Sequence, residues 1–294
     1  MGLEGLAPAK LNLFLHVGAV QPDGYHPLSS LVAFIDIGDR VRVERADRLS
    51  LQIEGPFGAG LSAGEDNLIV RALRRLGEVA GIGEPGLKVT LDKRLPIAAG
   101  LGGGSADAGA ALRLARAALD LPLDDAALEA TGADIGADGA MCVRSRPAWS
   151  EGRGDVLTPA PHLPAMPVVL VNPGAPSSTG AVYRAYDVAP RQADRPAPPA
   201  DWSVESVIDW LSAQRNDLEP PAIRLEPRIG EARERVAACE AVALARMSGS
   251  GATLFGLCRT AEDAARAARQ LSPLFPDGWV CCATVQGGES GQAL

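Results

Sequence analysis

The fold is decided by one glycine-rich stretch, Leu95-Pro96-Ile97-Ala98-Ala99-Gly100-Leu101-Gly102-Gly103-Gly104-Ser105-Ala106-Asp107. A strand ends there, the glycines follow, and an alanine-rich helix is predicted to run from Ser105 to Leu119. The first N–H groups of a helix have no partners within it, and the helix dipole adds positive potential at that end. Adjacent glycines let the backbone approach an anion closely. The stretch therefore predicts a phosphate-binding loop.

A glycine turn capped by Ser105 is the alternative interpretation of the same stretch. Three adjacent glycines exceed what a turn needs, and successive backbone N–H groups form an anion-binding nest, which favours the phosphate interpretation. The loop lacks a lysine, so backbone amides and a metal ion must supply most of the neutralisation. Because no glycine of the chain precedes a lysine, an ordinary Walker A loop is excluded.

Two other elements are candidates for contact with the same phosphates. The stretch Met247-Ser248-Gly249-Ser250-Gly251-Ala252 precedes an apolar strand. In Pro8-Ala9-Lys10-Leu11-Asn12-Leu13, alternation predicts a half-buried strand with Lys10 and Asn12 on one face. Such a pair either grips an anion or a hydroxyl, or simply faces solvent, and the strand alone leaves both interpretations open.

Composition limits the class of protein. The chain has 294 residues, 47% hydrophobic and 22% charged, which is typical of a globular protein with a sizeable core. Its 36 acidic and 28 basic residues give a net charge of −8, which argues against a nucleic-acid-binding surface. We find no secretory signal, and the longest uncharged stretch, residues 156–183, contains six prolines and so does not predict a membrane helix.

The cysteines and histidines indicate a cytoplasmic protein without a zinc site. Five cysteines lack any Cys-x-x-Cys spacing, which is typical of reduced thiols. Three histidines, His16, His26 and His162, lie far apart in the sequence. The sequence assigns no other metal ligands.

Strands and helices are mixed without strict alternation, so we predict an α+β fold. We expect strands at 7–16, 28–37 and 41–43, with a Gly38-Asp39 turn between the last two, then a helix at 67–80 and a strand at 87–91. The later part predicts helices at 204–213 and 261–271 and strands at 168–171, 252–258 and 279–285. Gly81-x-Gly83-x-x-Gly86 matches a dinucleotide fingerprint but follows a helix and leads into a strand, so we interpret it as a loop.

Proline-rich stretches suggest the domain organisation. Residues 159–167 are the most proline-dense before an apolar strand, which predicts a boundary between domains 1–160 and 161–294. Residues 187–200 are a second such stretch, interpreted as a surface loop of the later domain.

Taken in order, the early lysine strand, the central glycine loop and the late Met-Ser-Gly-Ser-Gly resemble the GHMP kinase superfamily. The resemblance spans nearly the whole chain and includes Asp23-Gly24-Tyr25-His26, Asn67-Leu68, Gly136-Ala137-Asp138, Glu151-Gly152-Arg153-Gly154 and Asn216-Asp217. It implies a two-domain α+β fold, with a left-handed β-α-β crossover in the N-terminal domain, a ferredoxin-like C-terminal domain and an active site in the cleft between them. The Asp-Gly-Tyr-His element is similar to that of kinases of the non-mevalonate isoprenoid route. This implies phosphorylation of the 2-hydroxyl of 4-diphosphocytidyl-2-C-methyl-D-erythritol.

The resemblance also implies roles for individual residues. Lys10 and Asp138 are the implied catalytic residues, and the implied cofactor is ATP with Mg²⁺. Residues implied for ATP are Asn67, Lys93, Pro96, Gly100, Leu101, Gly102, Gly103, Gly104, Ser105, Ala106, Ser248 and Gly249. Residues implied for the acceptor are Asn12, Tyr25, His26, Thr179 and Tyr183. The expected protein is a monomer or weak homodimer that binds small molecules, with neither nucleic acid nor membrane as a partner.

The chemistry suits this assignment, because a tertiary alcohol is a poor nucleophile and needs a carboxylate to organise its proton. A lysine nearby stabilises the phosphoryl group in transfer. Gly-Ala-Asp occurs twice, ending at Asp134 and Asp138, and counting back without gaps from Glu151 selects Asp138. Where the family usually has Val-Pro after this aspartate, the chain has Gly139-Ala140. Asp134 is expected to be structural.

Aromatic residues make up only 4% of the chain, so Tyr25 beside His26 in a glycine-marked turn is conspicuous. A cytosine ring gains about 1–3 kcal/mol by stacking on an aromatic side chain. The resemblance places Tyr25 and Tyr183 on the two sides of that ring, whereas the alternative is two ordinary surface tyrosines.

Three other functions compete with this interpretation. Another GHMP kinase, acting on a mevalonate derivative, homoserine or a sugar, is the main alternative, and the Asp-Gly-Tyr-His element argues against it. A catalytically inactive nucleotide-binding regulator is disfavoured by the intact Lys10 and Asp138. A Rossmann oxidoreductase fails because the chain lacks the required strand, glycine loop and helix in that order.

Overall fold

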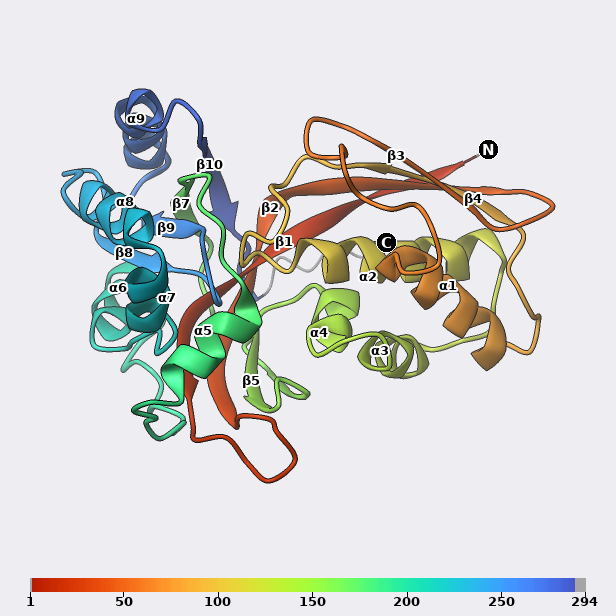
Figure 1. Cartoon of the computed structure of the whole chain (residues 1–294), viewed down its shortest axis with the longest axis horizontal. Coiled ribbons are helices and arrows are strands. Elements are labelled where there is room, and N and C mark those ends of the chain that lie inside the picture. The colour runs from red at the N-terminus through yellow and green to blue at the C-terminus, as the bar shows by residue number, and fades with distance from the viewer. Residues whose placement is uncertain (1, 289–294) are drawn as a thin grey trace. The chain divides into compact units, whose positions relative to one another are not determined.

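The computed structural model (Figure 1) describes residues 2–288. Within it, the chain forms two compact units. Unit 1 comprises the stretch ending at Lys10 together with Ile37–Ile97 and Gly102–Ser145. Unit 2 comprises Leu11–Asp36, Ala98–Leu101 and the stretch from Arg146 onward. Two long strands, β1 (Leu3–Val17) and β2 (Leu28–Arg45), run through both units. The boundary predicted at residue 160 stays a prediction.

Unit 1 combines a small sheet with four helices. Strand β3 (Ser50–Glu54) pairs in parallel with β4 (Leu87–Asp92), and α1 (Leu68–Val79) connects them. Strand β4 also pairs antiparallel with the second half of β2, from Arg40 opposite Asp92 to Arg45 opposite Leu87. Helices α2 (Gly103–Ala118), α3 (Asp125–Ala133) and α4 (Gly139–Arg144) complete the unit.

The small residues of α2 explain how tightly these helices pack. The buried face of α2 is mostly alanine and glycine. A Cβ added at Gly109 would lie 2.7 Å from the carbonyl carbon of Cys142, so only glycine allows α4 to approach at that point. The alanine-rich composition that predicted a helix therefore also lets the neighbouring backbone come close.

Unit 2 is built on an antiparallel sheet in the order β10-β7-β9-β8. Its strands are β7 (Met166–Asn172), β8 (Leu244–Met247), β9 (Leu254–Leu257) and β10 (Trp279–Val285), and β5 (Ala148–Gly152) pairs with β6 (Val156–Pro159) and with the first half of β2. Its helices are α5 (Thr179–Tyr186), α6 (Val204–Ser212), α7 (Glu219–Leu225), α8 (Pro227–Ala237) and α9 (Ala261–Leu271), followed by a 3₁₀ turn at Ser272–Leu274.

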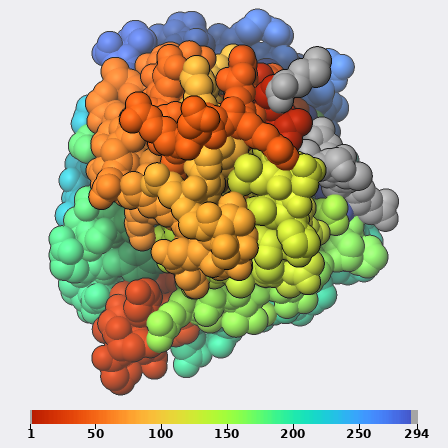
Figure 2. Space-filling model, turned by 90° about the vertical axis from the view of Figure 1, so that its right-hand side faces the viewer, coloured from red at the N-terminus to blue at the C-terminus, as the bar shows by residue number. Residues whose placement is uncertain are grey.

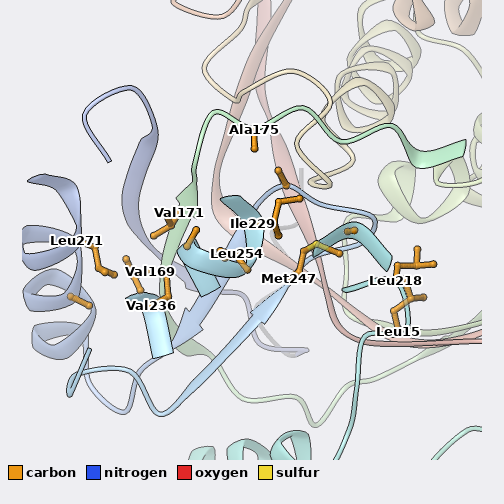
Figure 3. Close-up of a cluster of buried hydrophobic side chains, with 14 of the residues drawn as sticks. Leu15, Val169, Val171, Ala175, Leu218, Ile229, Val236, Met247, Leu254 and Leu271 are labelled. Carbon is orange, nitrogen blue, oxygen red and sulfur yellow. The ribbon is translucent and has the colours of Figure 1, made fainter. Parts of the chain in front are cut away.

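A continuous apolar core lies between the sheet of unit 2 and its helices (Figure 3). Val169 and Val171 of β7 and Leu254 of β9 supply the sheet side, while Val236 and Leu271 come from α8 and α9. These side chains are almost entirely excluded from solvent, so they contribute to stability through burial of apolar area.

Most predicted elements are confirmed. The helices expected at 204–213 and 261–271 are α6 and α9, the strands expected at 168–171 and 279–285 lie in β7 and β10, and residues 81–86 form a loop between α1 and β4. Residues 187–200 contain no helix or strand, as expected of a loop. The α+β class is confirmed.

Two expectations for the first strands are wrong. The strand from Ala7 was predicted to be half-buried, but every residue from Ala7 to Val17 is buried, because polar side chains on one face find partners inside the protein. The turn expected at Gly38-Asp39 does not exist, since β2 runs straight through it. A Cβ at Gly38 would lie 2.0 Å from the carbonyl oxygen of Ala7, so this glycine serves close strand approach rather than a turn.

The connection between β1 and β2, red in both views, stands out from the surface of unit 2 (Figures 1 and 2). Among the described residues, no helix combines the length and the apolar character that crossing a membrane requires.

Candidate active site

The glycine loop leads directly into α2, and its helix starts two residues earlier than predicted. Gly102 is the N-cap, in the left-handed conformation with φ of 63°, and no side chain caps the helix. Ser105 lies within the first turn, so the alternative interpretation, a glycine turn capped by Ser105, is wrong. Because the cap has no side chain, the unpartnered N–H groups of the first turn remain available to an anion.

Lys10 lies against this helix start within unit 1. A Cβ at Gly102 would lie 2.6 Å from Cγ of Lys10, so the lysine stem packs where any other residue at 102 would place its side chain. The Lys10 side chain is only 8% exposed, and its Nζ lies 3.5 Å from Oδ2 of Asp138, which is 35% exposed. A buried ammonium next to an accessible carboxylate is a suitable arrangement for phosphoryl transfer.

The two aspartates that end the Gly-Ala-Asp sequences have different partners in the structure. Asp134 pairs with Arg75, with 2.8 Å between Oδ2 and Nε, whereas Asp138 is the aspartate beside Lys10. Asp138 immediately precedes α4. A Cβ at Gly139 would lie 1.8 Å from the carbonyl oxygen of Gly132, so close backbone packing takes the place of the valine and proline usual in the family.

Lys93, implied for ATP binding, lies in a buried charge cluster beneath the loop. Its Nζ is 2.5 Å from Oδ2 of Asp39 and 2.7 Å from Oδ2 of Asp107, and all three side chains are less than 5% exposed. A Cβ at Gly103 would lie 3.1 Å from this Nζ. The other oxygen of Asp39 accepts hydrogen bonds from the backbone N–H groups of Arg94 and Leu95. The cluster therefore ties β2, the loop and α2 together.

Burial and charge act against each other in this cluster. Burial would lower the pKa of Lys93, but the charges of Asp107 and Asp39 outweigh it and raise that pKa. Burial raises the pKa of Asp107 to about 8, against the opposing effect of the Lys93 charge. One ammonium shared by two carboxylates leaves an excess negative charge, so a proton on Asp107 is the expected response.

Asn67, also implied for ATP binding, is the N-cap of α1. Its Oδ1 accepts a hydrogen bond from the Ile69 N–H at 2.9 Å, and its Nδ2 donates to the Ser62 carbonyl oxygen at 2.8 Å. The side chain thus orders the start of α1 in unit 1.

In unit 2 the second glycine-rich stretch, residues 247–252, is called here the late glycine element. It packs on the start of the central glycine loop. The Ser248 hydroxyl donates to the Gly100 carbonyl oxygen at 3.0 Å, and the Thr253 N–H donates to that of Ala99 at 3.1 Å. A Cβ at Gly100 would lie 2.4 Å from the Ser248 carbonyl oxygen, and Gly249 has φ of 56°. The structure therefore brings together the two glycine elements that the sequence singled out.

Five further predicted residues also have defined positions in the structure. Leu101 is buried, and Pro96 is partly buried before the loop. Gly104 and Ala106 lie in the first turn of α2. Asn12 donates from Nδ2 to the Ser30 hydroxyl at 2.9 Å, and its backbone N–H donates to Ser248 Oγ at 3.3 Å.

The loop containing Tyr25 and His26 is held from two directions within unit 2. On one side, the Arg153 guanidinium lies 4.5 Å from the centroid of the Tyr25 ring and also pairs with Asp23. On the other side, His26 Nε2 lies 2.6 Å from Oδ1 of Asp187. Tyr25 itself is 53% exposed, so its ring is accessible to a ligand.

The two predicted acceptor residues on α5, Tyr183 and Thr179, contact different parts of unit 2. The Tyr183 and His26 ring centroids are 4.8 Å apart, with the planes tilted by 43°. Thr179 Oγ1 lies 2.8 Å from the Ser250 hydroxyl, next to the late glycine element. The start of α5 is thus joined to that element and its middle to the Tyr25–His26 loop.

Sequence reasoning missed the residues that hold the site in place. Asp39 was interpreted as part of a turn, and Asp107 and Asp187 carried no signal, because their partners lie far away in the sequence. Asn216 was part of the resemblance but had no role. In the structure its Nδ2 donates to the carbonyl oxygens of Met247 and Gly249, both at 2.8 Å.

Comparison with known proteins identifies the class. The model of the GHMP kinases N terminal domain matches residues 67–146, and that of the GHMP kinases C terminal domain matches residues 204–277. The chain belongs to the GHMP kinase family. It is therefore a small-molecule kinase with the two-domain α+β fold of that family, and membership implies ATP as the phosphoryl donor.

Individual members of the family indicate which kind of GHMP kinase the chain resembles. The chain is 52% identical over 284 residues to the 4-diphosphocytidyl-2-C-methyl-D-erythritol kinase of Caulobacter vibrioides, covering 95% of this chain and 98% of the relative. It is 46% identical to the kinase of the same name from Cereibacter sphaeroides, covering 97% and 99%. A crystal structure of 4-(cytidine 5'-diphospho)-2C-methyl-D-erythritol kinase superimposes with a TM-score of 0.78 at 36% identity, covering 97% and 100%. A homoserine kinase from Cytophaga hutchinsonii, 19% identical with a TM-score of 0.65, shares the fold.

Proposed function

We propose that the chain transfers the γ-phosphoryl group of ATP to the 2-hydroxyl of 4-diphosphocytidyl-2-C-methyl-D-erythritol, a step of the non-mevalonate route to isoprenoid precursors. The observation that carries this proposal is the Lys10–Asp138 pair beside the uncapped start of α2. It occurs in a chain that is 52% identical, over nearly its whole length, to a kinase named for this acceptor.

Lys10 and Asp138 are assigned the chemical step. The hydroxyl oxygen of the acceptor bonds to the γ-phosphorus as the bond from that phosphorus to the β,γ-bridging oxygen breaks, and ADP leaves. Asp138, which is accessible to a ligand, takes the hydroxyl proton. The Lys10 ammonium stabilises negative charge on the transferred group. The arrangement therefore supplies positioning and neutralisation, which is what this reaction needs.

The first turn of α2 is assigned the phosphates of ATP. Backbone N–H groups face an anion there without a side-chain cap, and the late glycine element lies against the start of the same loop. The ATP-binding roles of Asn67 and Lys93 remain part of this proposal, with Asn67 at the N-cap of α1 and Lys93 beneath Gly103.

The described residues suit Mg²⁺ that arrives with ATP. They contain no group of three or more histidine, cysteine or acidic side chains that could hold a metal ion by itself. Mg²⁺ is commonly held by phosphate oxygens, waters and one or two carboxylates, and Asp138 is the accessible carboxylate beside Lys10. When bound, the ion neutralises charge on the phosphates, for which the loop offers no lysine.

Recognition of the cytosine is assigned to Tyr25, His26 and Tyr183. The exposed ring of Tyr25 offers a stacking face, and the ring of His26 lies against Tyr183. Aromatic faces together with hydrogen bonds to the base edge are the usual means of recognising a single base. Asn12 and Thr179 complete the proposed acceptor residues.

We also infer a cytoplasmic location and a monomer or weak homodimer. Each of the five cysteines is a free thiol, which is typical of a reducing compartment. Sedimentation analysis over a range of protein concentrations tests the oligomeric state.

Steady-state kinetics tests the proposed function against other members of the family. The purified chain with ATP and Mg²⁺ should release ADP rapidly with 4-diphosphocytidyl-2-C-methyl-D-erythritol and no faster than background with mevalonate, homoserine or galactose. Turnover that is faster with one of the three control acceptors would refute the assignment of the acceptor. ATP consumption that is indifferent to every acceptor would refute the assignment as a small-molecule kinase.

A further inference from the structure

The carboxylate of Asp187 is bound to the histidine proposed to recognise the base. His26 Nε2 and Asp187 Oδ1 are 2.6 Å apart, and the His26 side chain is only 9% exposed. Nothing in the sequence pairs these residues, which are 161 positions apart. The contact therefore arises from the way the β1–β2 connection lies on α5.

One face of α5 holds the histidine ring. Tyr186 and Asp187 follow Tyr183 by three and four residues, which places all three on one side of the helix, with Asp187 at its C-cap. The ring centroid of His26 is 4.8 Å from that of Tyr183 and 6.1 Å from that of Tyr186. Tyr186 is itself held by its hydroxyl, which bonds to the Val17 carbonyl oxygen and accepts from the Arg191 N–H. His26 therefore has a fixed ring orientation.

The carboxylate also determines where the ring carries its proton. An ionised carboxylate only accepts hydrogen bonds, so Nε2 must be the protonated nitrogen. In a neutral imidazole the other nitrogen, Nδ1, is then an acceptor. Among the described residues Nδ1 has no hydrogen-bond partner, so its lone pair is available to a ligand.

We propose that Asp187 is a specificity-determining positioning residue, which holds His26 in the tautomer whose Nδ1 accepts a hydrogen bond from the exocyclic amino group of cytosine. The inference rests on the proposed function, since it concerns the base of that acceptor. Uracil presents a carbonyl oxygen at the same position, so two acceptors would face each other. A site built to pair with a donor discriminates strongly against a ligand that lacks one.

The Asp187→Asn variant tests this proposal, because an amide can donate to Nε2 and so allow the proton to move to Nδ1. Assays at pH 8 compare the cytidine acceptor with its uridine counterpart. The ratio of their kcat/KM values should fall by about tenfold or more, which corresponds to about 1.4 kcal/mol, and the KM for ATP should be unchanged. Asp209→Asn, at an exposed position on α6, is the matched control and should leave the ratio unchanged.

A merely structural role for Asp187 predicts a different result. If the carboxylate only held the loop in place, Asp187→Asn and Asp187→Ala would weaken both acceptors equally, and an unchanged ratio would overturn the proposal. The tautomer itself is measured by long-range ¹H–¹⁵N NMR at pH 8, in a chain with only three histidines. The proposal requires a proton on Nε2 of His26 in the native protein and a shift toward Nδ1 in Asp187→Asn.

The NMR result is independent of activity. A protonated Nδ1 in the native protein overturns the tautomer assignment even if the enzyme is active. Conversely, failure of the native enzyme to phosphorylate the cytidine acceptor would refute the proposed function, whatever the tautomer.

Discussion

The glycine loop at the start of α2 and the Tyr25–His26 loop are both proposed to contact substrate, but they are built differently. The glycine loop depends on close backbone packing, with the Lys10 stem against Gly102 and the Ser248 carbonyl against Gly100. The Tyr25–His26 loop depends on side chains from distant parts of the chain, Arg153 on one side and Asp187 on the other. The proposed phosphate site thus has no room for added side chains at Gly100 and Gly102, whereas the proposed base site depends on particular side chains.

The largest effect is expected at the proposed catalytic pair, Lys10 and Asp138. Asp138→Asn should lower kcat by about 10²–10⁴-fold, because it removes the acceptor of the hydroxyl proton, and ATP binding should stay nearly intact. Asp134→Asn is the matched control, since Asp134 pairs with Arg75 instead of Lys10. Rapid-quench kinetics and nucleotide titration measure both properties. A nearly normal kcat in Asp138→Asn, together with a greatly lowered kcat in Asp134→Asn, would show that the wrong aspartate was assigned.

Gly102→Val should have the next largest effect. A β-branched side chain there meets the Lys10 stem and is strained at φ of 63°. We expect kcat/KM for ATP to fall by about 100-fold or more, in line with the cost of misplacing catalytic groups by about 1 Å. Gly81→Val is the control, because Gly81 has φ of 69° but no atom within 4 Å of its added Cβ. Equal losses in the two variants would mean that backbone strain, rather than the phosphate site, explains the result.

Tyr25→Ala tests the base-recognition loop. Loss of one stacking face costs about 1–3 kcal/mol. The KM for the acceptor should therefore rise by about 5- to 150-fold, while that for ATP changes little. Tyr25→Phe should be much milder, because the ring face and its contact with Arg153 remain. A rise in the ATP KM with an unchanged acceptor KM would show that the two nucleotides were assigned to the wrong residues.

The last effect is expected on stability and not on activity, in the buried cluster of Lys93, Asp39 and Asp107. Burial raises the pKa of Asp107 to about 8 in the folded protein, so between its ordinary value near 3.8 and this value the native state binds more protons than the unfolded state. The contribution of Asp107 to stability is thus fully present in acid and is lost as the pH rises toward 8. Asp107→Asn removes this dependence, so its deficit relative to the native protein should shrink between pH 5 and pH 8 in urea unfolding. A deficit that grows with pH would contradict the assigned direction of the shift.

The comparison of the two loops also shows how much of each could be predicted from the sequence. The glycine loop could be predicted because its residue types and spacing are local signals, whereas the roles proposed for Lys10 and Asp138 came from the resemblance to the family. The buried partners Asp39, Asp107 and Asp187 could not, because each is defined by a contact formed only in the folded chain. Gly38-Asp39 shows the difference, since a dipeptide typical of turns lies inside β2, where the glycine admits the Ala7 backbone and the aspartate binds Lys93.

The most direct test of the proposed reaction is the identity of its product. The native chain, incubated with ATP, Mg²⁺ and 4-diphosphocytidyl-2-C-methyl-D-erythritol, is analysed by mass spectrometry and ³¹P NMR. We predict that the acceptor gains one phosphoryl group as a monoester on its 2-hydroxyl, with one ADP formed for each product molecule. Phosphate found on another hydroxyl, or ADP formed without a phosphorylated acceptor, would contradict the account.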